Sequence, residues 1–345
     1  MKLLLVGPLP PPLGGATVLF AQLVEELKLK NELNITVINT ARKDISVLGS
    51  GLHFFKVLFE ILIAVRSHDV VGFHASNKGA LLFSPFIWLI CNICSKPWVF
   101  RGFGGYYHEW FQNLSTISRW IFTHTLLKAD LVLLETKASV GFFKNFDPAL
   151  NVKWYSNSRK RIAKHEENKN NHKANRFVFL GHVSVVKGID ELIKVAKTLD
   201  DIVIDIYGPL KDGLTEDSFV NNISYKGVIA PQKVAEQISK YDALILPSKY
   251  LKEGYPGVLI EAFSVGVPVI STKIGAIPEI VSEKSGILIE PGNTTELVDA
   301  ISRIKDSTQF FQTLKQGALE ASEQFSSEKW TEEYIKLSEQ LAYRD

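Results

Sequence analysis

Two glutamates, Glu253 and Glu261, lie eight positions apart in the stretch KEGYPGVLIEAFSVGVPVIST, residues 252–272. Between them, Pro256 and Gly257 predict the start of a helix, because proline is favoured in the first helical turn. Gly257 also lets a ligand approach the backbone closely, since it has no side chain. Carboxylates accept hydrogen bonds from hydroxyl groups. The stretch therefore predicts a site for a ligand rich in hydroxyls, placed around a helix start.

The helix start itself predicts an anion site. Unpaired amides of Gly257, Val258 and Leu259, together with the helix dipole, favour negative charge at this point. A single ligand satisfies both features, namely a nucleoside diphosphate sugar. Its diphosphate would lie on the amides, its ribose on Glu261 and its sugar hydroxyls on Glu253. Two glutamates at this spacing also arise by chance on solvated helix faces, so the pair alone leaves that alternative open.

Two further loops carry groups that suit such a ligand. Lys187 precedes Gly188 in GHVSVVKGIDELIKVAK, where its ammonium either extends into solvent or faces an anion across the strand end. His182 is a second possible donor in the same loop. Gly14 and Gly15, after the first apolar run, allow backbone amides to approach a phosphate or a sugar, although a tight turn explains them equally well.

These loops follow short apolar runs that alternate with stretches of helical spacing, which is typical of parallel βα units. Each half of the chain contains six such runs. The predicted strands are 2–6, 34–40, 69–74, 97–101, 130–135 and 152–156 in the first half, and 176–181, 202–208, 222–228, 242–248, 267–272 and 286–290 in the second. Ligands of doubly wound sheets bind at the carboxyl ends of the strands, so we expect the chemistry in the loops that follow.

The length of 345 residues favours two domains. We expect an N-terminal domain over 1–157, a C-terminal domain over 158–325 and a final amphipathic helix within 326–345. The polar stretch 157–176 predicts a solvated linker or loop. A net charge of +2 gives no support for nucleic-acid binding.

Three apolar segments bear on membranes. The start MKLLLVGPLPPPLGG is interrupted too early for a signal peptide, and we interpret it as a strand. Residues 80–100 contain Pro85 and polar breaks, which favours a buried helix followed by a strand over a membrane span. Residues 52–68 favour a helix that covers the sheet, with an interfacial helix as the alternative.

The only two cysteines, at 91 and 94, are expected to be buried reduced thiols rather than a redox or metal pair.

Taken together, these motifs resemble the retaining glycosyltransferases of family 4, which have the GT-B fold of two Rossmann-like α/β domains facing across a cleft. The resemblance covers the full length. It is carried by the paired glycines near the start, FLGHVSVVKGIDELI, IYGP, YKGVI, YDALILPS, LPSKYLKEGYPGVLIEAFSVGVPVISTKIGAIPEIV and the closing FSSEKWTEEYIKL.

The resemblance implies a role for each matching residue. In such enzymes the C-terminal domain binds the activated donor and the N-terminal domain binds most of the acceptor. By that pattern Glu253 contacts the donor sugar, Glu261 holds the ribose and Lys187 neutralises the phosphates. The remaining expected ligand contacts are Tyr255, Pro256, Gly257 and Val258 at the diphosphate, Gly14 and Gly15 at the phosphates or acceptor, and Gly208, Gly227, Val228 and Ile229 at the nucleobase.

The sequence departs from the family pattern at two places. His182 stands where the family commonly has arginine, so a titratable ring replaces a fixed positive charge. After the fourth strand, many members have a histidine near the reacting carbon, whereas VFRGFGGYYHEW has Arg101 and, seven residues later, His108. Each is either a catalytic or acceptor-binding group or a structural residue. The aromatic residues of 110–121 are expected in the core.

The resemblance implies a retaining transfer of a sugar from a nucleoside diphosphate sugar to a saccharide or lipid-linked saccharide, in bacterial cell-surface polysaccharide synthesis. No Asp-x-Asp follows a strand, so no metal and no other cofactor is expected. We expect a cytoplasmic protein, with a membrane surface at its inner face as a possible partner. The alternatives are a nucleotide-sugar epimerase or a phosphorylase of the same fold, and a non-catalytic sugar-nucleotide-binding partner.

Overall fold

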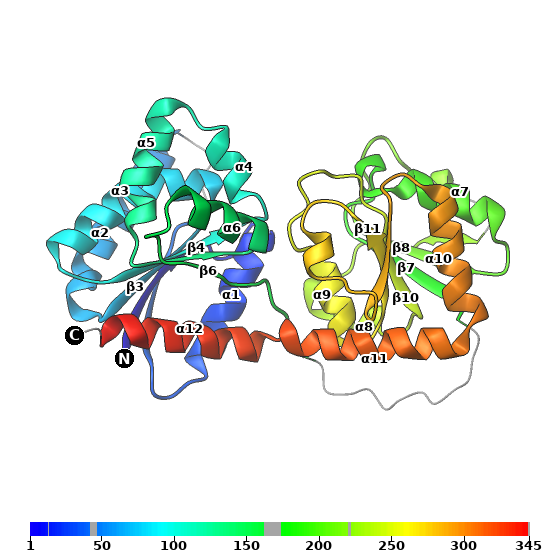
Figure 1. Ribbon diagram of the computed structural model, residues 1–345. Coiled ribbons are helices and arrows are strands. Elements are labelled where there is room, and N and C mark those ends of the chain that lie inside the picture. The colour runs from blue at the N-terminus through cyan, green and yellow to red at the C-terminus, as the bar shows by residue number, and fades with distance from the viewer. Residues whose placement is uncertain (13, 42–46, 162–173, 220–221, 344–345) are drawn as a thin grey trace. The chain divides into compact units, whose positions relative to one another are not determined.

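The computed structural model describes all residues except 13, 42–46, 162–173, 220–221 and 344–345. The described chain divides into two compact units, each with its own sheet (Figure 1). Unit 1 consists of Met1–Asn157 and Ser327–Asp345, and unit 2 of Ser158–Ser326. Most of the polar stretch expected as a linker, residues 162–173, lies outside the described residues.

Unit 1 has six parallel strands in the order β2-β1-β3-β4-β5-β6. Its strands are β1 (Lys2–Gly7), β2 (Asn34–Asn39), β3 (Val70–Ser76), β4 (Trp98–Phe103), β5 (Leu131–Leu134) and β6 (Val152–Trp154). Its helices are α1 (Gly15–Lys28), α2 (Val47–Ala64), α3 (Asn77–Ile93), α4 (Tyr107–Gln112), α5 (Thr116–His124), α6 (Lys137–Phe146) and α12 (Ser327–Ala342), with 3-10 turns η1 (Val65–Ser67) and η2 (Leu126–Lys128).

Unit 2 has six parallel strands in the order β12-β11-β10-β7-β8-β9. Its strands are β7 (Arg176–Leu180), β8 (Val203–Tyr207), β9 (Ile223–Tyr225), β10 (Ala243–Leu246), β11 (Val269–Thr272) and β12 (Gly286–Ile289). Its helices are α7 (Ile189–Thr198), α8 (Val234–Ile238), α9 (Gly257–Ser264), α10 (Thr294–Asp306) and α11 (Thr308–Gln324), with 3-10 turns η3 (Val185–Lys187), η4 (Glu216–Ser218), η5 (Pro231–Lys233) and η6 (Ile277–Glu279).

The twelve predicted strands are confirmed, with ends that differ by at most three residues. Side chains that alternate along a strand enter opposite cores, as the two-residue repeat of a strand requires. On β1, Leu4 and Val6 belong to the core beneath α2 and α3, whereas Leu3 and Leu5 belong to the core beneath α1 and α12. Helices on both faces therefore bury each sheet, which explains why the strands appear as nearly continuous apolar runs.

The expected C-terminal amphipathic helix is α12. It packs on the α1 side of unit 1, where the Thr331 hydroxyl donates to the Glu26 carboxylate at 2.8 Å. The Tyr155 hydroxyl donates to the Trp330 carbonyl at 2.7 Å, and its ring packs edge-on against the indole. These contacts place the last helix in the core of the first unit.

The cysteines are free, and Cys91 is buried in α3. Burial raises the pKa of the Cys91 thiol to about 12, so it stays protonated at neutral pH. Residues 80–100 form a helix followed by the buried strand β4, as expected, but the expected burial of the helix is wrong for one face of α3, where Phe86 and Ile93 are exposed. No helix within the described residues has both the length and the apolar character to cross a membrane.

Candidate functional site

The point where the strand order of unit 2 reverses lies between β7 and β10. The chain leaves β7 towards β8 on one side and leaves β10 towards β11 on the other, so the loops after these two neighbouring strands lead to opposite sides of the sheet order. Doubly wound sheets bind ligands at such a position. Lys187 lies in the loop after β7 and Glu253 in the loop after β10. Topology therefore brings together two residues that are 66 positions apart.

Glu253 and Lys187 form an ion pair and hydrogen bond at this edge of the sheet. The Ser248 hydroxyl donates to the same carboxylate oxygen of Glu253 at 2.7 Å. The ammonium of Lys187 also lies 5.3 Å from the centre of the Tyr250 ring. Glu253 is only 6% exposed, so these partners replace most of the water around its carboxylate. An ammonium has three donors, and Lys187 therefore retains donors for a further anion.

The backbone of Glu253 is fixed by a residue that sequence reasoning missed. The amide of Ala276 donates to the Glu253 carbonyl at 2.9 Å. Gly275, with φ of +54°, precedes it, and a Cβ at this position would lie 2.2 Å from the same carbonyl oxygen. Only glycine fits such a close approach. The motif TKIGAIPEIV contained the signal, because an isolated glycine after a strand often marks contact between backbones.

Helix α9 begins at Gly257, with Pro256 as its N-cap residue. The amide of Leu259 donates to the Pro256 carbonyl at 3.0 Å, so the prediction of a free amide at Leu259 is wrong. Gly257 and Val258 are half-buried at the helix start. The side chain of Tyr255 is buried, and its hydroxyl donates to Glu279 at 2.6 Å, so only its backbone is placed to meet a ligand.

Glu261 has a partner that the sequence did not reveal. Arg159 Nε donates to Glu261 Oε1 at 2.7 Å, and Arg159 Nη1 donates to the Ser158 carbonyl at 2.9 Å. The guanidinium lies over the first residue of α9, since a Cβ on Gly257 would be 2.0 Å from Nη2. A cation at this positive end of a helix is electrostatically unfavourable by itself. The Glu261 carboxylate offsets that cost, and each predicted glutamate is thus paired with a basic residue.

The residues predicted beside a nucleobase lie at the ends of β8 and β9. The amide of Gly208 donates to the Gly227 carbonyl at 2.9 Å, and the Tyr225 hydroxyl donates to the Gly208 carbonyl at 2.9 Å. Gly208 has φ of +133°, and a Cβ there would lie 1.7 Å from the Gly181 carbonyl oxygen. Val228 is exposed beyond this turn and Ile229 is half-buried. The strand ends of β7, β8 and β9 are therefore tied together by backbone contacts.

His182 is exposed in the loop after β7. Its carbonyl lies 3.5 Å from the Ser184 hydroxyl. His182 therefore stands on the surface of unit 2, with its backbone held by the loop. In unit 1, Gly14 is the N-cap residue of α1 in extended conformation, and both Gly14 and Gly15 are exposed. The Gly14 amide is already used, because it donates to the Thr17 hydroxyl at 3.0 Å.

Arg101 lies in the interior of unit 1. Its guanidinium is 4.4 Å from the centre of the Tyr155 ring and 5.0 Å from that of Phe103. Burial lowers the pKa of Arg101 below its ordinary value. Its register partner on β3 is His74, whose Nε2 lies 3.1 Å from the Tyr334 hydroxyl. Burial, and to a lesser extent Arg101, holds the pKa of His74 well below its ordinary value.

His108 is half-buried near the start of α4. Its Nδ1 lies 2.9 Å from the Ser139 hydroxyl on α6, and its ring packs against Phe142 at 5.9 Å between centres. These contacts orient the imidazole within unit 1. Phe111, in the aromatic segment expected in the core, is buried as expected, whereas Trp120 is exposed, contrary to that expectation.

A second charged cluster borders the Lys187 loop. Lys249 Nζ donates to both carboxylate oxygens of Asp190, at 2.9 and 2.8 Å, and to Glu191 Oε1 at 3.0 Å. Asp190 and Glu191 open α7, where acidic groups suit the helix dipole. The backbone amide of Lys249 also donates to the Val186 carbonyl at 2.8 Å. This cluster holds the loops after β7 and β10 against each other.

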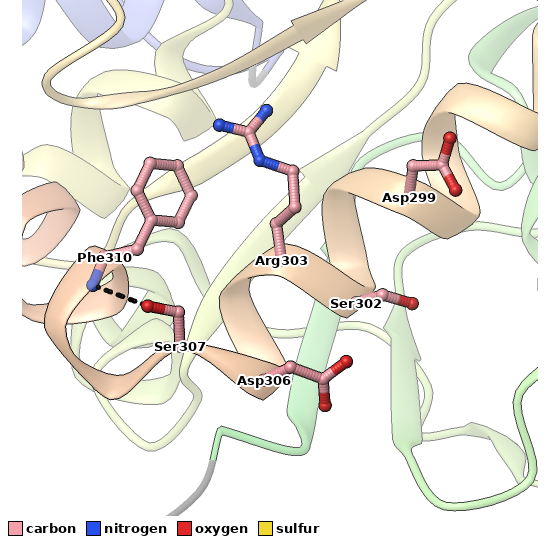
Figure 2. Close-up of a pocket in the computed structure, with 6 residues that line it drawn as sticks. All are labelled: Asp299, Ser302, Arg303, Asp306, Ser307 and Phe310. Atoms are coloured by element: carbon pink, nitrogen blue, oxygen red, sulfur yellow. Dashed lines mark hydrogen bonds between the residues drawn. The ribbon is translucent and has the colours of Figure 1, made fainter.

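Figure 2 shows a pocket at a different place in unit 2, where α10 ends and α11 begins. Its volume is about 650 Å³, and it is wide open to solvent. Arg303 lies over the Phe310 ring at 4.6 Å, and the Phe310 amide donates to the Ser307 hydroxyl at 3.2 Å. None of the predicted site residues lines this pocket. Its arginine serves below as a control.

Comparison with known families gives a match for the second half of the chain. Residues 160–320 match the family described as Glycosyl transferases group 1. A putative teichuronic acid biosynthesis glycosyltransferase of Bacillus subtilis is 31% identical over 129 residues, which are 36% of this chain and 32% of the relative. The N-acetyl-alpha-D-glucosaminyl L-malate synthase of Bacillus anthracis is 39% identical over 104 residues, 29% of this chain and 26% of the relative. The chain thus matches about a third or less of these two relatives.

Comparison with solved structures covers both units. HepE of Anabaena, crystallised with UDP, has a TM-score of 0.74 at 16% identity over 99% of this chain and 100% of that one. A sucrose-phosphate synthase from Thermosynechococcus elongatus has a TM-score of 0.70 at 16% identity, over 99% of this chain and 98% of that one. Such identities show the fold alone. Residues 160–320 of the chain are thus similar to the group 1 glycosyl transferases, and the chain has the GT-B fold.

Proposed function

We propose that this protein is a glycosyltransferase that moves a sugar from a nucleoside diphosphate sugar to a saccharide or lipid-linked saccharide in cell-surface polysaccharide synthesis. Unit 2 binds the donor and unit 1 binds the acceptor. The family match over 160–320 supports the reaction class. The teichuronic acid relative, and a capsular polysaccharide biosynthesis glycosyltransferase of Staphylococcus aureus that is 26% identical over 161 residues, support the pathway class.

One observation carries the proposal, namely the Lys187–Glu253 pair at the strand-order reversal of unit 2. The buried carboxylate of Glu253 can accept hydrogen bonds from hydroxyls, and the ammonium of Lys187 keeps donors for phosphates. The start of α9 follows the acid by four residues and adds backbone amides. Similar structures of HepE in complex with UDP and with UDP-glucose support a nucleotide sugar as ligand of this fold.

The chemistry that this arrangement suits is departure of a diphosphate. Breaking the bond between the sugar carbon and the phosphate oxygen leaves an additional negative charge on the leaving group. Preorganised donors stabilise such developing charge by several kcal/mol in a site shielded from water. We assign this role to Lys187 and the first amides of α9, with Glu253 gripping the sugar hydroxyls and Glu261 the ribose.

Three finer features belong to the same proposal. Transfer retains the anomeric configuration, which the anomeric proton coupling of the product checks. It requires no metal, so a chelator leaves the rate unchanged. The protein works in the cytoplasm at the inner face of the membrane, where lipid-linked acceptors are available.

A thermal-shift panel tests the donor site. We expect one nucleoside diphosphate among UDP, GDP and ADP, and its sugar derivatives, to raise the melting temperature, because ligands that bind only the folded state stabilise it. Stabilisation rises with ligand concentration, by about 2.7 kcal/mol at a hundredfold excess over Kd. No shift with any of these ligands would contradict the proposal. Nucleotide sugar turnover without any acceptor would instead indicate an epimerase, and binding without turnover a non-catalytic protein.

Arg159 gives a prediction specific to this chain. Arg159→Ala is expected to weaken nucleoside diphosphate binding about tenfold, since it removes a charged hydrogen bond that orients Glu261 and a cation beside the first residue of α9. Isothermal titration calorimetry measures the change. Arg159→Lys keeps the charge without the planar fork and is expected to recover only part of the affinity.

Arg303→Ala is the matched control for this prediction, because Arg303 is an exposed arginine of the same unit that lines the pocket of Figure 2. It should leave the affinity unchanged. Tighter binding by Arg159→Ala would show instead that Arg159 competes with the ribose for Glu261.

A further inference from the structure

The outer face of α2 is apolar although it faces solvent. Phe55 is 68% exposed and Phe59 is 63% exposed, and Leu52, Leu62 and Ile63 continue the same stripe. The inner face of the helix is buried on the sheet through Val57, Ile61 and Val65. A helix that is apolar on all sides is normally covered on all sides. Contact with the sheet accounts for only one side of α2.

Helix α3 extends the same surface. Leu82, Phe86, Leu89 and Ile93 recur at helical spacing and are exposed, with Ile93 70% exposed. The two helices lie next to each other (Figure 1), and Phe54 of α2 packs edge-on against Phe86 at 5.3 Å between ring centres. We call this surface the α2–α3 face, and define it by the exposed residues Leu52, Phe55, Phe59, Leu62, Ile63, Leu82, Phe86, Leu89 and Ile93. Apolar patches of such extent on a protein surface mark interaction sites.

Basic side chains stand within and around the α2–α3 face. Lys56 lies between Phe55 and Phe59 on the outer side of α2, Arg66 follows one turn after Ile63, and all three of Lys56, Arg66 and Lys78 are exposed. Across residues 47–93 the acids are Glu60 and Asp69. Glu60 lies 3.8 Å from Lys56, and Asp69 accepts from the Lys2 amide at the start of the sheet. The face therefore combines aromatic and aliphatic groups with an excess of positive charge.

The apolar and positively charged character of the α2–α3 face favours some binding partners over others. A symmetric dimer through the face would bring two copies of the same positively charged patch together, because a two-fold interface pairs one patch with itself. An anionic lipid surface attracts those bases and accepts the apolar groups at the boundary of headgroups and acyl chains. Long basic side chains reach the headgroups while their stems stay among apolar neighbours.

We propose that the α2–α3 face is a membrane-docking surface that lies on an anionic phospholipid bilayer. The aromatic and aliphatic side chains of the face enter the headgroup boundary, and Lys56, Arg66 and Lys78 contact lipid phosphates. No described helix meets the requirements of a membrane span, so α2 and α3 lie on the bilayer. The proposal concerns unit 1 only and does not depend on the donor chemistry of unit 2.

Co-sedimentation with vesicles tests the proposal. The full-length protein is expected to bind vesicles of phosphatidylglycerol and phosphatidylcholine, and to bind pure phosphatidylcholine vesicles more weakly. Phe55→Glu/Phe59→Glu should lower the partition coefficient at least roughly tenfold, because two large exposed apolar groups no longer enter the lipid. Both residues are exposed, so the melting temperature should stay unchanged.

Leu29→Glu is the matched control. Leu29 is 77% exposed at the end of α1, on the other side of the sheet. The substitution therefore exchanges an exposed apolar side chain for a carboxylate away from the α2–α3 face. It should bind vesicles as the wild type does. Arg66→Glu/Lys78→Glu tests the charges, and should lower binding to anionic vesicles roughly tenfold at low salt with little effect on neutral ones.

Three outcomes would overturn the proposal. The first is no binding of the wild type to anionic vesicles. The second is equal binding by the wild type and Phe55→Glu/Phe59→Glu. The third is a concentration-dependent dimer in light scattering that this double variant abolishes, which would assign the face to self-association. All three are read without any measurement of sugar transfer, so failure here is distinct from failure of the donor-site proposal.

Discussion

Replacing Lys187 by alanine is expected to lower kcat by roughly 10²- to 10³-fold, the effect of removing one preorganised donor from a site of developing charge. The ammonium lies where the strand order of unit 2 reverses, and its pairing with Glu253 leaves two donors for a phosphate. Because a free nucleoside diphosphate carries more charge than its sugar ester, Lys187→Ala should weaken binding of the former more than the latter. Steady-state kinetics and calorimetry with both ligands measure this difference.

The same substitution has a structural consequence that must be separated from the catalytic one. Glu253 is 6% exposed, and loss of its cation leaves a buried carboxylate that still accepts from the Ser248 hydroxyl. Breaking one half of a buried ion pair costs about 3 kcal/mol of folding stability. Lys187→Ala/Glu253→Gln removes the stranded charge, so it should recover most of the melting temperature and none of the activity. Recovery of activity in the double variant would contradict a phosphate-binding role for Lys187.

The sheets could be predicted because their strands are buried on both faces. LLLV in β1 and ALIL in β10 are continuous apolar runs, and each is bounded by polar or turn-forming residues. The apolar run and the residues that flank it are local signals in the sequence. They are clear here because helices bury the strands on both faces, which makes the runs nearly continuous. The order of the strands is not a local signal. The structure supplies it, and with it the reversal between β7 and β10 that places the candidate site.

The sequence predicted individual residues of the candidate site, but not which of them pair with each other. Lys187 and Glu253 are 66 residues apart, and Arg159 and Glu261 are 102 apart, so each pair forms only when the fold brings the loops together. Arg159 lies in a basic stretch that resembles a solvated linker, with no helical or strand period to single it out. Conversely, Tyr255 has a promising position in the motif, but its side chain turns into the core to reach Glu279.

In helices α2 and α3, the spacing of apolar residues does not predict which side of the helix is buried. In α2 and α3, apolar residues occupy every side, so the sequence indicates a helix but not which side is covered. The sequence interpretation assigned them to the core because that is the common fate of apolar helices. Only the positions of the sheet and neighbouring helices reveal that Phe55, Phe59 and Ile93 face outwards. The exposed apolar face thus depends on tertiary structure.

Glu253→Gln is expected to lower kcat about a hundredfold, since it exchanges a charged acceptor of sugar hydroxyl bonds for a neutral one of the same shape. The amide can still accept from Ser248 and Lys187, so the fold should be retained. Affinity for the free nucleoside diphosphate should remain unchanged or increase. The reason is that the substitution removes a negative charge near the phosphates and releases Lys187 from its ion pair.

Measuring kcat and nucleotide affinity together distinguishes two roles for the Glu253 carboxylate, namely binding the sugar and holding Lys187 in place. If Glu253 acts on the sugar, turnover falls while calorimetry with the free nucleotide shows no loss. If it acts by holding Lys187 in place, both quantities fall together, and the assignment of Glu253 to the sugar is wrong. Glu290→Gln is the matched control, because Glu290 also pairs with a lysine, Lys273, at 2.9 Å, but on the exposed surface of the same unit. Its turnover should match the wild type, since exposed ion pairs contribute little.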